Sequence, residues 1–410
     1  MTDSQLNKDK APNASAAQEP LFRIEWTDPT TGVKGYAVVY SLMHGICGGG
    51  LRMRPGCTMK EVEGLARTMA IKKGLTHAVG GGAKGGIDYD PAKPDARQIL
   101  KNFVTSMSPL YTAFWSTGED MGVRQEVLNE VFEELGLGFP NQATINRTPN
   151  PAEAMARMSA GRNLRLDGED LSTNIGGYGV AEAAGAAAAC LGWTISERRA
   201  VLQGFGSMGG AAARYLARLG FSVIGISDAE CFVTNNDGLD VEKLFATRSE
   251  RGEIDRSALG PNDKVLPRDD CLTYETDLFV PAALGEVINE DNVDLIPAKL
   301  VVEAANLACT PGARRRLHER GKVVIPDFVA NSATAAWFTW TTFGEIGGES
   351  EDSLAKVRSV MSDTVRRIFD MMAQGGIGAE QAAAQVADEN IREMNESWGQ
   401  RYPVISEQKG

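Results

Sequence analysis

The sequence has few of the residues that build transition-metal sites. Its 410 residues include only three histidines, His44, His77 and His318, which lie far apart along the chain. The six cysteines are scattered, and no two of them form a C-x-x-C pair. Because such sites need closely spaced ligands, we expect no metal centre. We expect the thiols to be reduced and mainly structural.

Clustered positive charge and long apolar runs are also scarce. Lys and Arg number 42 against 54 Asp and Glu, so the formal net charge is −12. Nucleic acids and anionic membranes bind clustered positive charge, so neither is expected as a partner. No apolar run approaches the ~20 residues of a membrane-spanning helix. Residues 1–20 are polar and lack the apolar core of a signal peptide, so we expect a disordered tail and a cytoplasmic protein.

The most informative stretch is Gly80-Gly81-Gly82-Ala83-Lys84-Gly85-Gly86. Glycine loses much conformational freedom on folding, so this density is costly unless the backbone must approach another group closely. We predict a loop in which Lys84 is surrounded by backbone. Poor solvation of its ammonium group would lower its pKa and make the amine available as a general acid or base. The alternative is a flexible surface turn with a solvated lysine.

A second glycine pattern lies in the middle of the chain. A predicted strand, 198–203, is followed by Gly204-Phe205-Gly206-Ser207-Met208-Gly209 and then by a helix that Gly220 can end. The next predicted strand, 221–227, leads to Asp228, which lies 24 residues beyond Gly204. This combination is the fingerprint of dinucleotide binding, with the pyrophosphate at the helix N-terminus.

Asp228 also bears on the choice of cofactor. Its carboxylate can accept hydrogen bonds from both hydroxyl groups of an adenosine ribose, and it would repel a 2′-phosphate. The next residues, Ala229 and Glu230, offer no cation to neutralise such a phosphate. We therefore predict NAD rather than NADP.

Three further strands are predicted at 278–281, 300–303 and 323–325. The last two lead to Asn306 and Asn331, which we expect at the carboxyl edge of a parallel sheet, where such folds bind ligands. From about residue 351 the sequence predicts helices, and their apolar residues at helical spacing indicate core packing rather than a site.

Taken in order, these segments resemble the glutamate, leucine, phenylalanine and valine dehydrogenase superfamily over most of the chain, from about Tyr36 to Met394. The resemblance is carried by Gly49-Gly50-Leu51-Arg52-Met53, Gly81-Gly82-Ala83-Lys84-Gly85-Gly86, Glu119-Asp120-Met121-Gly122-Val123, Gly177-Tyr178-Gly179-Val180, Gln203-Gly204-Phe205-Gly206, and Pro326-Asp327 with Ala330-Asn331.

The resemblance implies an α/β fold with two domains. A substrate domain would cover 21–165, a Rossmann-type NAD-binding domain 166–349, and C-terminal helices over 350–410 would pack back on the first domain. The implied reaction is oxidative deamination of an L-amino acid to a 2-oxo acid and ammonia, and its reverse. Members are usually oligomers, so we expect a homo-oligomer.

The resemblance also assigns roles to residues. Lys84 matches the catalytic lysine that activates water, and Asp120 matches the aspartate that exchanges protons with the substrate amine. Lys72 matches the lysine that pairs with the substrate α-carboxylate, and glycines 48, 49 and 50 would line the substrate. Helical projection alone does not separate Lys72 from Lys73, since both lie near the apolar face of a helix that a capping box at Thr58 opens.

Three departures from the family pattern affect the expected specificity. Glutamate-specific members carry a lysine immediately before Gly-Gly-(Leu/Ile)-Arg, but that position is Gly48 here. With no cation there, burial of a second carboxylate is unfavourable, so we expect an apolar or aromatic substrate, as in the leucine and phenylalanine branch. The family threonine that meets the nicotinamide amide is replaced by Gly176. Trp337, Phe338 and Trp340 indicate either an aromatic substrate pocket or core packing.

Two other interpretations stay open. A catalytically silent homologue could bind nucleotide or amino acid for regulation, and an active member could act on an unusual amine or a modified amino acid. Retention of Lys72, Lys84 and Asp120 favours an enzyme, whereas Gly176 and the aromatic segment leave room for the alternatives.

Overall fold

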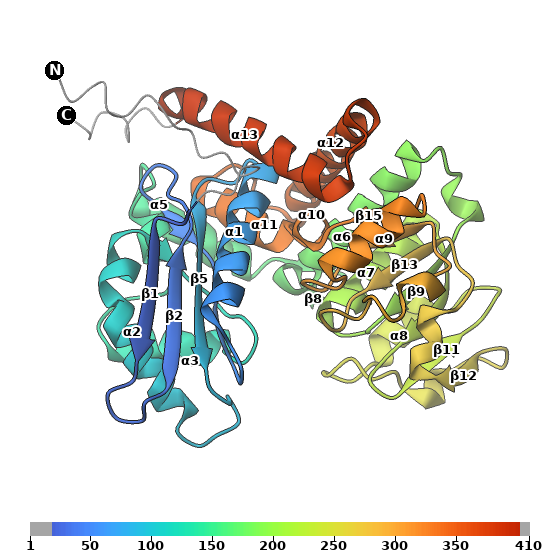
Figure 1. Ribbon diagram of the computed structural model, residues 1–410, viewed down its shortest axis with the longest axis horizontal. Helices are drawn as coiled ribbons and strands as arrows, with labels where there is room; N and C mark the ends of the chain where they lie inside the picture. The colour runs from blue at the N-terminus through green and yellow to red at the C-terminus, as the bar shows by residue number, and fades with distance from the viewer. Residues whose placement is uncertain (1–18, 402–410) are drawn as a thin grey trace. The chain divides into compact units, whose positions relative to one another are not determined.

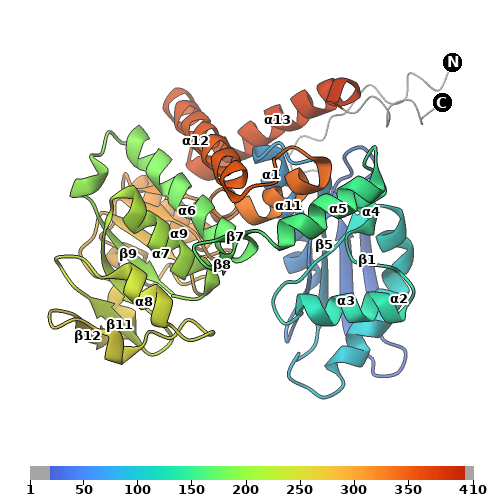
Figure 2. The same ribbon diagram turned by 180° about the vertical axis from the view of Figure 1, so that it is seen from behind.

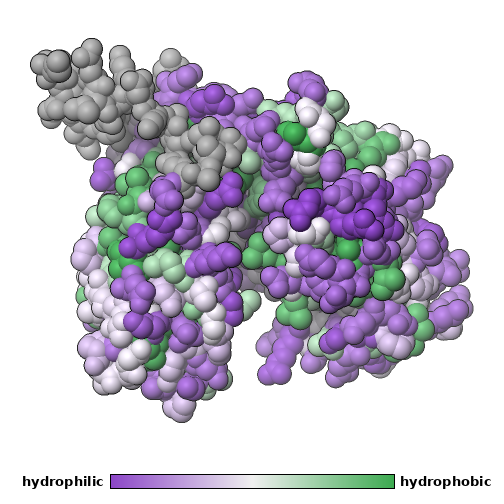
Figure 3. Space-filling model, viewed as in Figure 1, coloured by the Kyte–Doolittle hydropathy of each residue, from purple (hydrophilic) through white to green (hydrophobic). Residues whose placement is uncertain are grey.

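The computed structural model describes residues 19–401, so the expected tail lies outside the described residues apart from its last two positions. The chain divides into two compact units, each with its own sheet (Figure 1). Of the described residues, the first unit contains 19–158, Thr339–Glu345 and 387–401. The second contains Ser159–Phe338 and Ile346–Val386. Hydrophilic and hydrophobic residues are interspersed on the surface of both units (Figure 3).

A six-stranded mixed sheet forms the centre of the first unit. Its order is β1-β2-β5-β3-β6, with β4 also paired to β5. The strands are β1 (Phe22–Thr27), β2 (Lys34–Val39), β3 (Cys47–Gly48), β4 (Leu51–Arg54), β5 (Gly81–Asp88) and β6 (Trp115–Ser116).

Helices cover both faces of this sheet. One face packs on α1 (Met59–Leu75), through a small apolar cluster that joins Val38 of β2 to Val62 and Ala66. The other face packs on α2 (Ala96–Ala113) and α3 (Gln125–Glu134), through a larger cluster, and both of these helices are visible in Figure 2. The short α4 (Gln142–Ile145) and then α5 (Pro151–Arg162) follow.

The glycine-rich run forms strand β5, so the prediction of a loop was wrong. β5 pairs antiparallel with β2 and parallel with β3 and β4. A Cβ on Gly81 would stand 1.9 Å from the carbonyl oxygen of Ser41, and a Cβ on Gly82 would stand 2.1 Å from that of Ala66 in α1. The glycines are therefore needed because neighbouring backbone approaches a buried strand closely, which is the condition expected for such a costly composition.

The second unit contains a seven-stranded sheet in the order β12-β11-β10-β9-β13-β14-β15. Its five parallel strands are β10 (Ser222–Ser227), β9 (Arg199–Gln203), β13 (Leu278–Pro281), β14 (Leu300–Val302) and β15 (Val323–Ile325), close to the predicted positions. The edge strands β11 (Cys231–Thr234) and β12 (Lys264–Pro267) are antiparallel.

The second unit also contains α6 (Leu171–Cys190), α7 (Ser207–Leu219), α8 (Val241–Thr247), α9 (Pro311–Glu319), α10 (Asp327–Ala330) and the first part of α11 (Ala333–Phe343), whose residues from Thr339 onward belong to the first unit. Helix α7 ends at Gly220, whose φ of 101° is left-handed, as predicted. The parallel order with a helix after the first strand is that of a Rossmann-type sheet. None of the helices within residues 19–401 combines the length and apolar character that a membrane crossing needs.

The C-terminal helices depart from the predicted arrangement. We expected residues 350–410 to pack on the first domain, but α12 (Ser350–Gly375) packs along α6, and Ile346–Val386 belongs to the second unit. Only the later part of α13 (Ala379–Arg401) groups with the first unit. There Asn390 Nδ2 donates to the carbonyl oxygen of Gly74 at 3.0 Å.

Candidate active site

Lys84 and Asp120 form a buried ion pair in the first unit. Lys84 Nζ lies 2.7 Å from Asp120 Oδ2, and their side chains are 8% and 14% exposed. Burial lowers the pKa of Lys84, Asp120 opposes this effect, and the nearby Arg52 lowers it further. The lysine in β5 is therefore poorly solvated, as predicted, but an acid accompanies it.

Arg52 holds Asp120 in place. Its Nε lies 2.9 Å from Asp120 Oδ2, and its Nη1 lies 2.7 Å from Glu61 Oε1 in the first turn of α1. Burial alone would raise the pKa of Asp120, but Lys84 and Arg52 outweigh burial and hold that pKa well below its usual range. Asp120 therefore stays ionised near neutral pH, and Lys84 is the member of the pair that can exchange a proton.

At the start of α1, one of the two hydrogen bonds of the predicted capping box is present. Thr58 accepts a hydrogen bond from the backbone N–H of Glu61, as expected. The carboxylate of Glu61 binds Arg52 and Arg54 instead of returning to the cap. Thus Glu61 connects the helix start to the ion pair.

The predicted substrate glycines, Gly48, Gly49 and Gly50, let their own backbone lie close to β5 and to the segment around Asp120. A Cβ on Gly49 would stand 1.7 Å from the carbonyl oxygen of Ala83, and a Cβ on Gly50 would stand 3.3 Å from Asp120 Cβ. A Cβ on Gly48 would stand 2.9 Å from Lys73 Nζ. The expectation that no cation lies near Gly48 was therefore wrong, because the ammonium group of Lys73 lies there. Lys72 and Lys73 are both buried in the last turn of α1.

A cavity of about 490 Å³ borders Asp120. It is lined by Pro91, Ala92, Glu119, Asp120, Gly122, Val123 and Arg124. Small-molecule sites usually have volumes of roughly 300–1,000 Å³. Asp120 therefore borders a space that could admit a small substrate.

The turn between β9 and α7 fits a dinucleotide pyrophosphate. Gly204 has a φ of 96°, and a Cβ on Gly209 would stand 2.1 Å from the carbonyl oxygen of Gly204. A Cβ on Gly206 would meet nothing within 4 Å, and no side chain caps the start of α7. The first and third glycines thus make the tight turn, and the second leaves open space at a helix N-terminus suited to a phosphate.

Asp228 stands at the end of β10, as predicted, but its carboxylate is already engaged. Oδ1 accepts from the backbone N–H groups of Glu230 and Cys231 at 2.8 and 2.9 Å. Oδ2 accepts from the backbone N–H of Ile254 at 2.9 Å and from Arg256 Nη1 at 2.7 Å. The side chain of Asp228 is only 1% exposed. The adjacent sequence contains no cation, yet the fold brings Arg256 to this carboxylate.

Asn306 and Asn331 meet at the carboxyl edge of the sheet, as predicted. Asn331 Nδ2 donates to Asn306 Oδ1 and to the carbonyl oxygen of Ala304, each at 3.0 Å. Asn331 Oδ1 is buried and has no hydrogen-bond partner among the described residues. An unpaired buried acceptor is unfavourable, so this oxygen is suited to a ligand donor such as a carboxamide.

A hydroxyl group lies beside Gly176, although the family threonine is missing there. Thr334 Oγ1 would be 2.6 Å from a Cβ on Gly176. Thr334 lies three residues after Asn331, so the two belong to adjacent turns near the same sheet edge. No pattern in the sequence pairs Gly176 with Thr334, because the contact joins residues far apart in the chain.

A buried ion network holds the segments that carry these asparagines. Arg314 Nη2 lies 2.7 Å from Glu303 Oε2 and 2.9 Å from Asp327 Oδ1. The backbone N–H of Leu307 also donates to Asp327 Oδ2 at 3.1 Å. Glu303 follows β14 and Asp327 starts α10, so the network fixes both strand ends relative to each other.

Trp337 and Trp340 belong to packed cores. Trp337 Nε1 donates to Ser353 Oγ at 2.9 Å in the second unit. Trp340 is fully buried, and its Nε1 donates to the carbonyl oxygen of Thr76 at 3.2 Å in the first unit. These contacts favour core packing over an aromatic substrate pocket.

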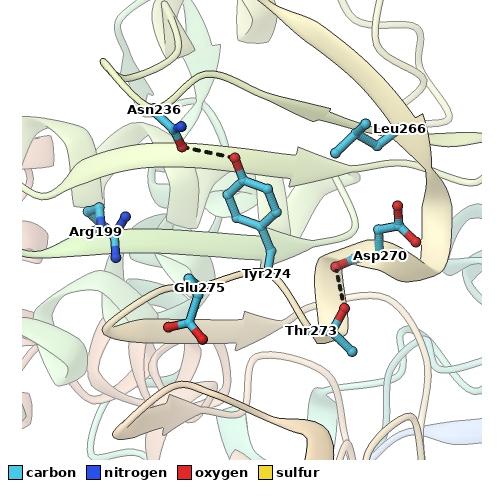
Figure 4. A pocket seen from close by; sticks show the side chains of 7 residues that line it. All are labelled: Arg199, Asn236, Leu266, Asp270, Thr273, Tyr274 and Glu275. Carbon is cyan, nitrogen blue, oxygen red and sulfur yellow. Dashed lines mark hydrogen bonds between the residues drawn. The ribbon is translucent and has the colours of Figure 1, made fainter.

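A separate cavity of about 550 Å³ lies in the second unit and is shown in Figure 4. Tyr274 points across it, and its hydroxyl donates to Asn236 Oδ1 at 2.9 Å. The cavity also contacts Arg199, the first residue of β9, so it lies at the amino edge of the parallel strands. The predicted cofactor residues lie at the opposite, carboxyl edge.

The chain matches two family models. Residues 168–399 match the glutamate/leucine/phenylalanine/valine dehydrogenase model, and residues 18–136 match the model for the dimerisation domain of the same dehydrogenases. Solved glutamate dehydrogenases share the fold. The hetero-hexameric enzyme of Thermus thermophilus superposes with a TM-score of 0.71 at 23% identity over 91% of this chain and 89% of that one. The Plasmodium falciparum enzyme gives 0.74 at 21% identity over 93% and 84%.

Related sequences are also those of glutamate dehydrogenases. The NADP(+)-dependent glutamate dehydrogenase of Pyrobaculum calidifontis is 30% identical over 346 residues, which cover 82% of this chain and 79% of that enzyme. The NADP-specific glutamate dehydrogenase A1 of Halobacterium salinarum is 30% identical over 375 residues, covering 90% and 87%. The chain therefore belongs to the glutamate/leucine/phenylalanine/valine dehydrogenase family of amino-acid dehydrogenases.

Proposed function

We propose that this protein catalyses the nicotinamide-dinucleotide-dependent oxidative deamination of an L-amino acid to a 2-oxo acid and ammonia, and the reverse reductive amination. The observation that carries the proposal is the buried pair of Lys84 and Asp120, 2.7 Å apart and held by Arg52. It combines an amine of lowered pKa with a carboxylate that stays ionised, which suits proton transfer in both directions.

A nicotinamide cofactor held by residues of the second unit would supply hydride acceptance, so that the substrate amine at Cα becomes an iminium group. The Lys84 amine would take a proton from the water that attacks this carbon, and the ammonium so formed would stabilise the developing oxygen charge. The proton taken up by Lys84 would pass through the ionised Asp120 carboxylate to the departing amine, and Lys72 would hold the α-carboxylate.

Residues of the second unit would hold the cofactor. The turn of Gly204, Gly206 and Gly209 would bind the pyrophosphate at the start of α7. Asn331 Oδ1 and the Thr334 hydroxyl would receive the nicotinamide carboxamide, with Thr334 taking the place of the threonine that Gly176 replaces.

The cofactor preference depends on Arg256. The prediction of NAD assumed a free Asp228 carboxylate, but that carboxylate accepts four hydrogen bonds from the protein. The side chain of Arg256 is 34% exposed and could meet a 2′-phosphate. Related enzymes are named as NADP-dependent. These observations support use of NADP alongside the predicted NAD.

The predicted apolar or aromatic substrate assumed that no cation lies near Gly48, but a Cβ on Gly48 would stand 2.9 Å from Lys73 Nζ. We therefore include dicarboxylic amino acids among the candidate substrates.

A homo-oligomer is proposed from the dimerisation-domain match and from β1, an edge strand that begins with the half-exposed Phe22.

The test is an absorbance assay of NADH and NADPH formation with apolar, aromatic and acidic L-amino acids, and of the reverse reaction with 2-oxo acids and ammonia. Turnover supports the proposal. Lys84→Ala should remove nearly all turnover and leave NADH affinity intact, because Lys84 lies outside the cofactor site. Cofactor binding without any turnover across the panel would instead support the catalytically silent homologue.

A further inference from the structure

The cavity of about 550 Å³ in the second unit has no part in the proposed reaction (Figure 4). Its volume falls within the roughly 300–1,000 Å³ of small-molecule sites. It lies at the amino edge of the parallel strands, whereas the predicted cofactor residues lie at the carboxyl edge. Its lining includes one cation, Arg199, and two carboxylates, Asp270 and Glu275. Negative charge therefore exceeds positive charge by one unit.

An aromatic ring with a fixed position lies in the middle of this cavity. The hydroxyl of Tyr274 donates to Asn236 Oδ1 at 2.9 Å, and its ring meets the ring of Phe232 edge-on, with centroids 5.2 Å apart. Leu266 packs against the same apolar core and adds an aliphatic surface. The cavity thus offers an apolar surface of defined shape, with polar groups around it.

The three charged side chains of the lining form no ion pair with any residue that the structure describes. Arg199 is held through its backbone, whose N–H donates to Asp277 Oδ2 at 2.9 Å, so its guanidinium group is left for a ligand. The backbone carbonyl oxygen of Asp270 accepts from the Thr273 hydroxyl at 3.3 Å, and the carboxylate of Asp270 is left for a ligand as well.

Glu275 influences a cation but does not bind it. Its charge acts on Lys322. Lys322 Nζ, however, donates to the carbonyl oxygens of Ile296, Pro297 and Ala298 at 2.7, 2.8 and 2.8 Å. Because an ammonium group has three hydrogens and these carbonyl groups use them, the carboxylate of Glu275 remains available to a cation from outside the chain.

The charges are arranged around the aromatic ring. Figure 4 shows Arg199 and Glu275 on one side of the Tyr274 ring and Asp270 on the other. The head of an α-amino acid carries a carboxylate and an ammonium group next to each other, which match Arg199 and Glu275. An aliphatic stem leaving this head would cover the Tyr274 ring and Leu266 and so be removed from water. A cation at the end of that stem would meet Asp270.

We propose that this cavity binds a basic α-amino acid such as lysine or ornithine. Near pH 7 such a ligand carries two ammonium groups and one carboxylate, so each of its charges has an opposite partner in the lining. An amino acid with an apolar side chain would leave Asp270 without a partner, and a diamine would leave Arg199 without one. The inference does not depend on the proposed function, because Lys84 and the cavity belong to different units.

The experiment is a calorimetric titration of the full-length wild type at pH 7 with three ligands. Lysine is compared with norleucine, which lacks the second ammonium group, and with cadaverine, which lacks the carboxylate. An exposed ion pair changes affinity by up to about fivefold. Lysine should therefore bind about fivefold more tightly than either of the other two.

Variants assign the binding to this cavity. Asp270→Asn should weaken lysine binding by about fivefold and change norleucine binding by less than about twofold. Arg199→Gln should weaken both lysine and norleucine by about fivefold and should not weaken cadaverine. Asp269→Asn is the matched control, because Asp269 pairs with Arg268 and does not line the cavity. All three substituted positions are exposed, so the changes remove charge without disturbing a core.

Several results would overturn the proposal. Absence of lysine binding, or equal affinity for lysine, norleucine and cadaverine, would refute it. Lysine bound in the catalytic site instead would keep its affinity in Asp270→Asn and Arg199→Gln, and that result would refute it too. A loss in Asp269→Asn as large as that in Asp270→Asn would reduce the effect to general surface charge. None of these results alters the turnover expected in the absorbance assay, so the proposed function would stand or fall separately.

Discussion

Because Lys73 is buried, its charged ammonium group should lower the free energy of unfolding of the wild type at neutral pH. In the unfolded chain a lysine has a pKa of 10.5, whereas burial lowers the pKa of Lys73 to about 8 in the folded protein. This difference corresponds to roughly 3 kcal/mol of folding free energy. Lys73→Met, which keeps a similar length without the charge, should therefore raise the free energy of unfolding by up to roughly 3 kcal/mol at pH 7.

The sign of the pH dependence follows from proton binding. Below pH 8 Lys73 is protonated in both the folded and the unfolded state, so burial of its charge destabilises the folded protein to the full extent. Between pH 8 and 10.5 the folded state releases the proton while the unfolded state keeps it, so wild-type stability rises with pH. Cys47 does not alter this window, because burial raises its thiol pKa to about 12. The advantage of Lys73→Met should therefore shrink steadily above pH 8.

Urea unfolding of both proteins at pH 7, 8, 9 and 9.5 measures this difference. A variant that is less stable than the wild type, or a gap that does not change with pH, would show that Lys73 is not a strained buried cation.

Three further predictions concern the second unit. Arg256→Gln should lower kcat/KM with NADP by about tenfold relative to NAD; an unchanged ratio in the absorbance assay would refute the assigned phosphate contact. Thr334→Val should weaken NADH binding by about fivefold in fluorescence titration, because a net hydrogen bond contributes roughly 1 kcal/mol; unchanged affinity would remove Thr334 from the site. Arg314→Met should destabilise the protein by roughly 3–5 kcal/mol, since it leaves Glu303 and Asp327 buried without their cation; a thermal melt like that of the wild type would contradict this.

The parts that could be predicted from the sequence depend on local patterns. The turn after β9 was predictable because strand, glycines, helix and Asp228 follow one another within one short stretch. The pairing of Asn306 with Asn331 followed from a general rule, since the carboxyl ends of parallel strands share one edge.

The misassigned parts depend on contacts between distant residues. Glycine density predicts a turn as readily as a close backbone approach, and only the packing of Ala66 and Ser41 on β5 separates the two. Likewise, the sequence next to Gly48 and Asp228 contains no cation, yet the fold delivers Lys73 and Arg256 to them. The contact of Thr334 with Gly176 is equally invisible in a linear pattern.

The glycine composition of β5 also limits how this protein can change. Added side chains at Gly81, Gly82, Gly85 or Gly86 would collide with atoms 1.9 to 2.6 Å away, so the strand beneath the reacting lysine tolerates almost no substitution. New substrate preferences must then arise on elements that pack on the strand, where a single side chain can be exchanged without rebuilding the sheet. In this chain the final turn of α1, which carries Lys72 and Lys73, is such a place.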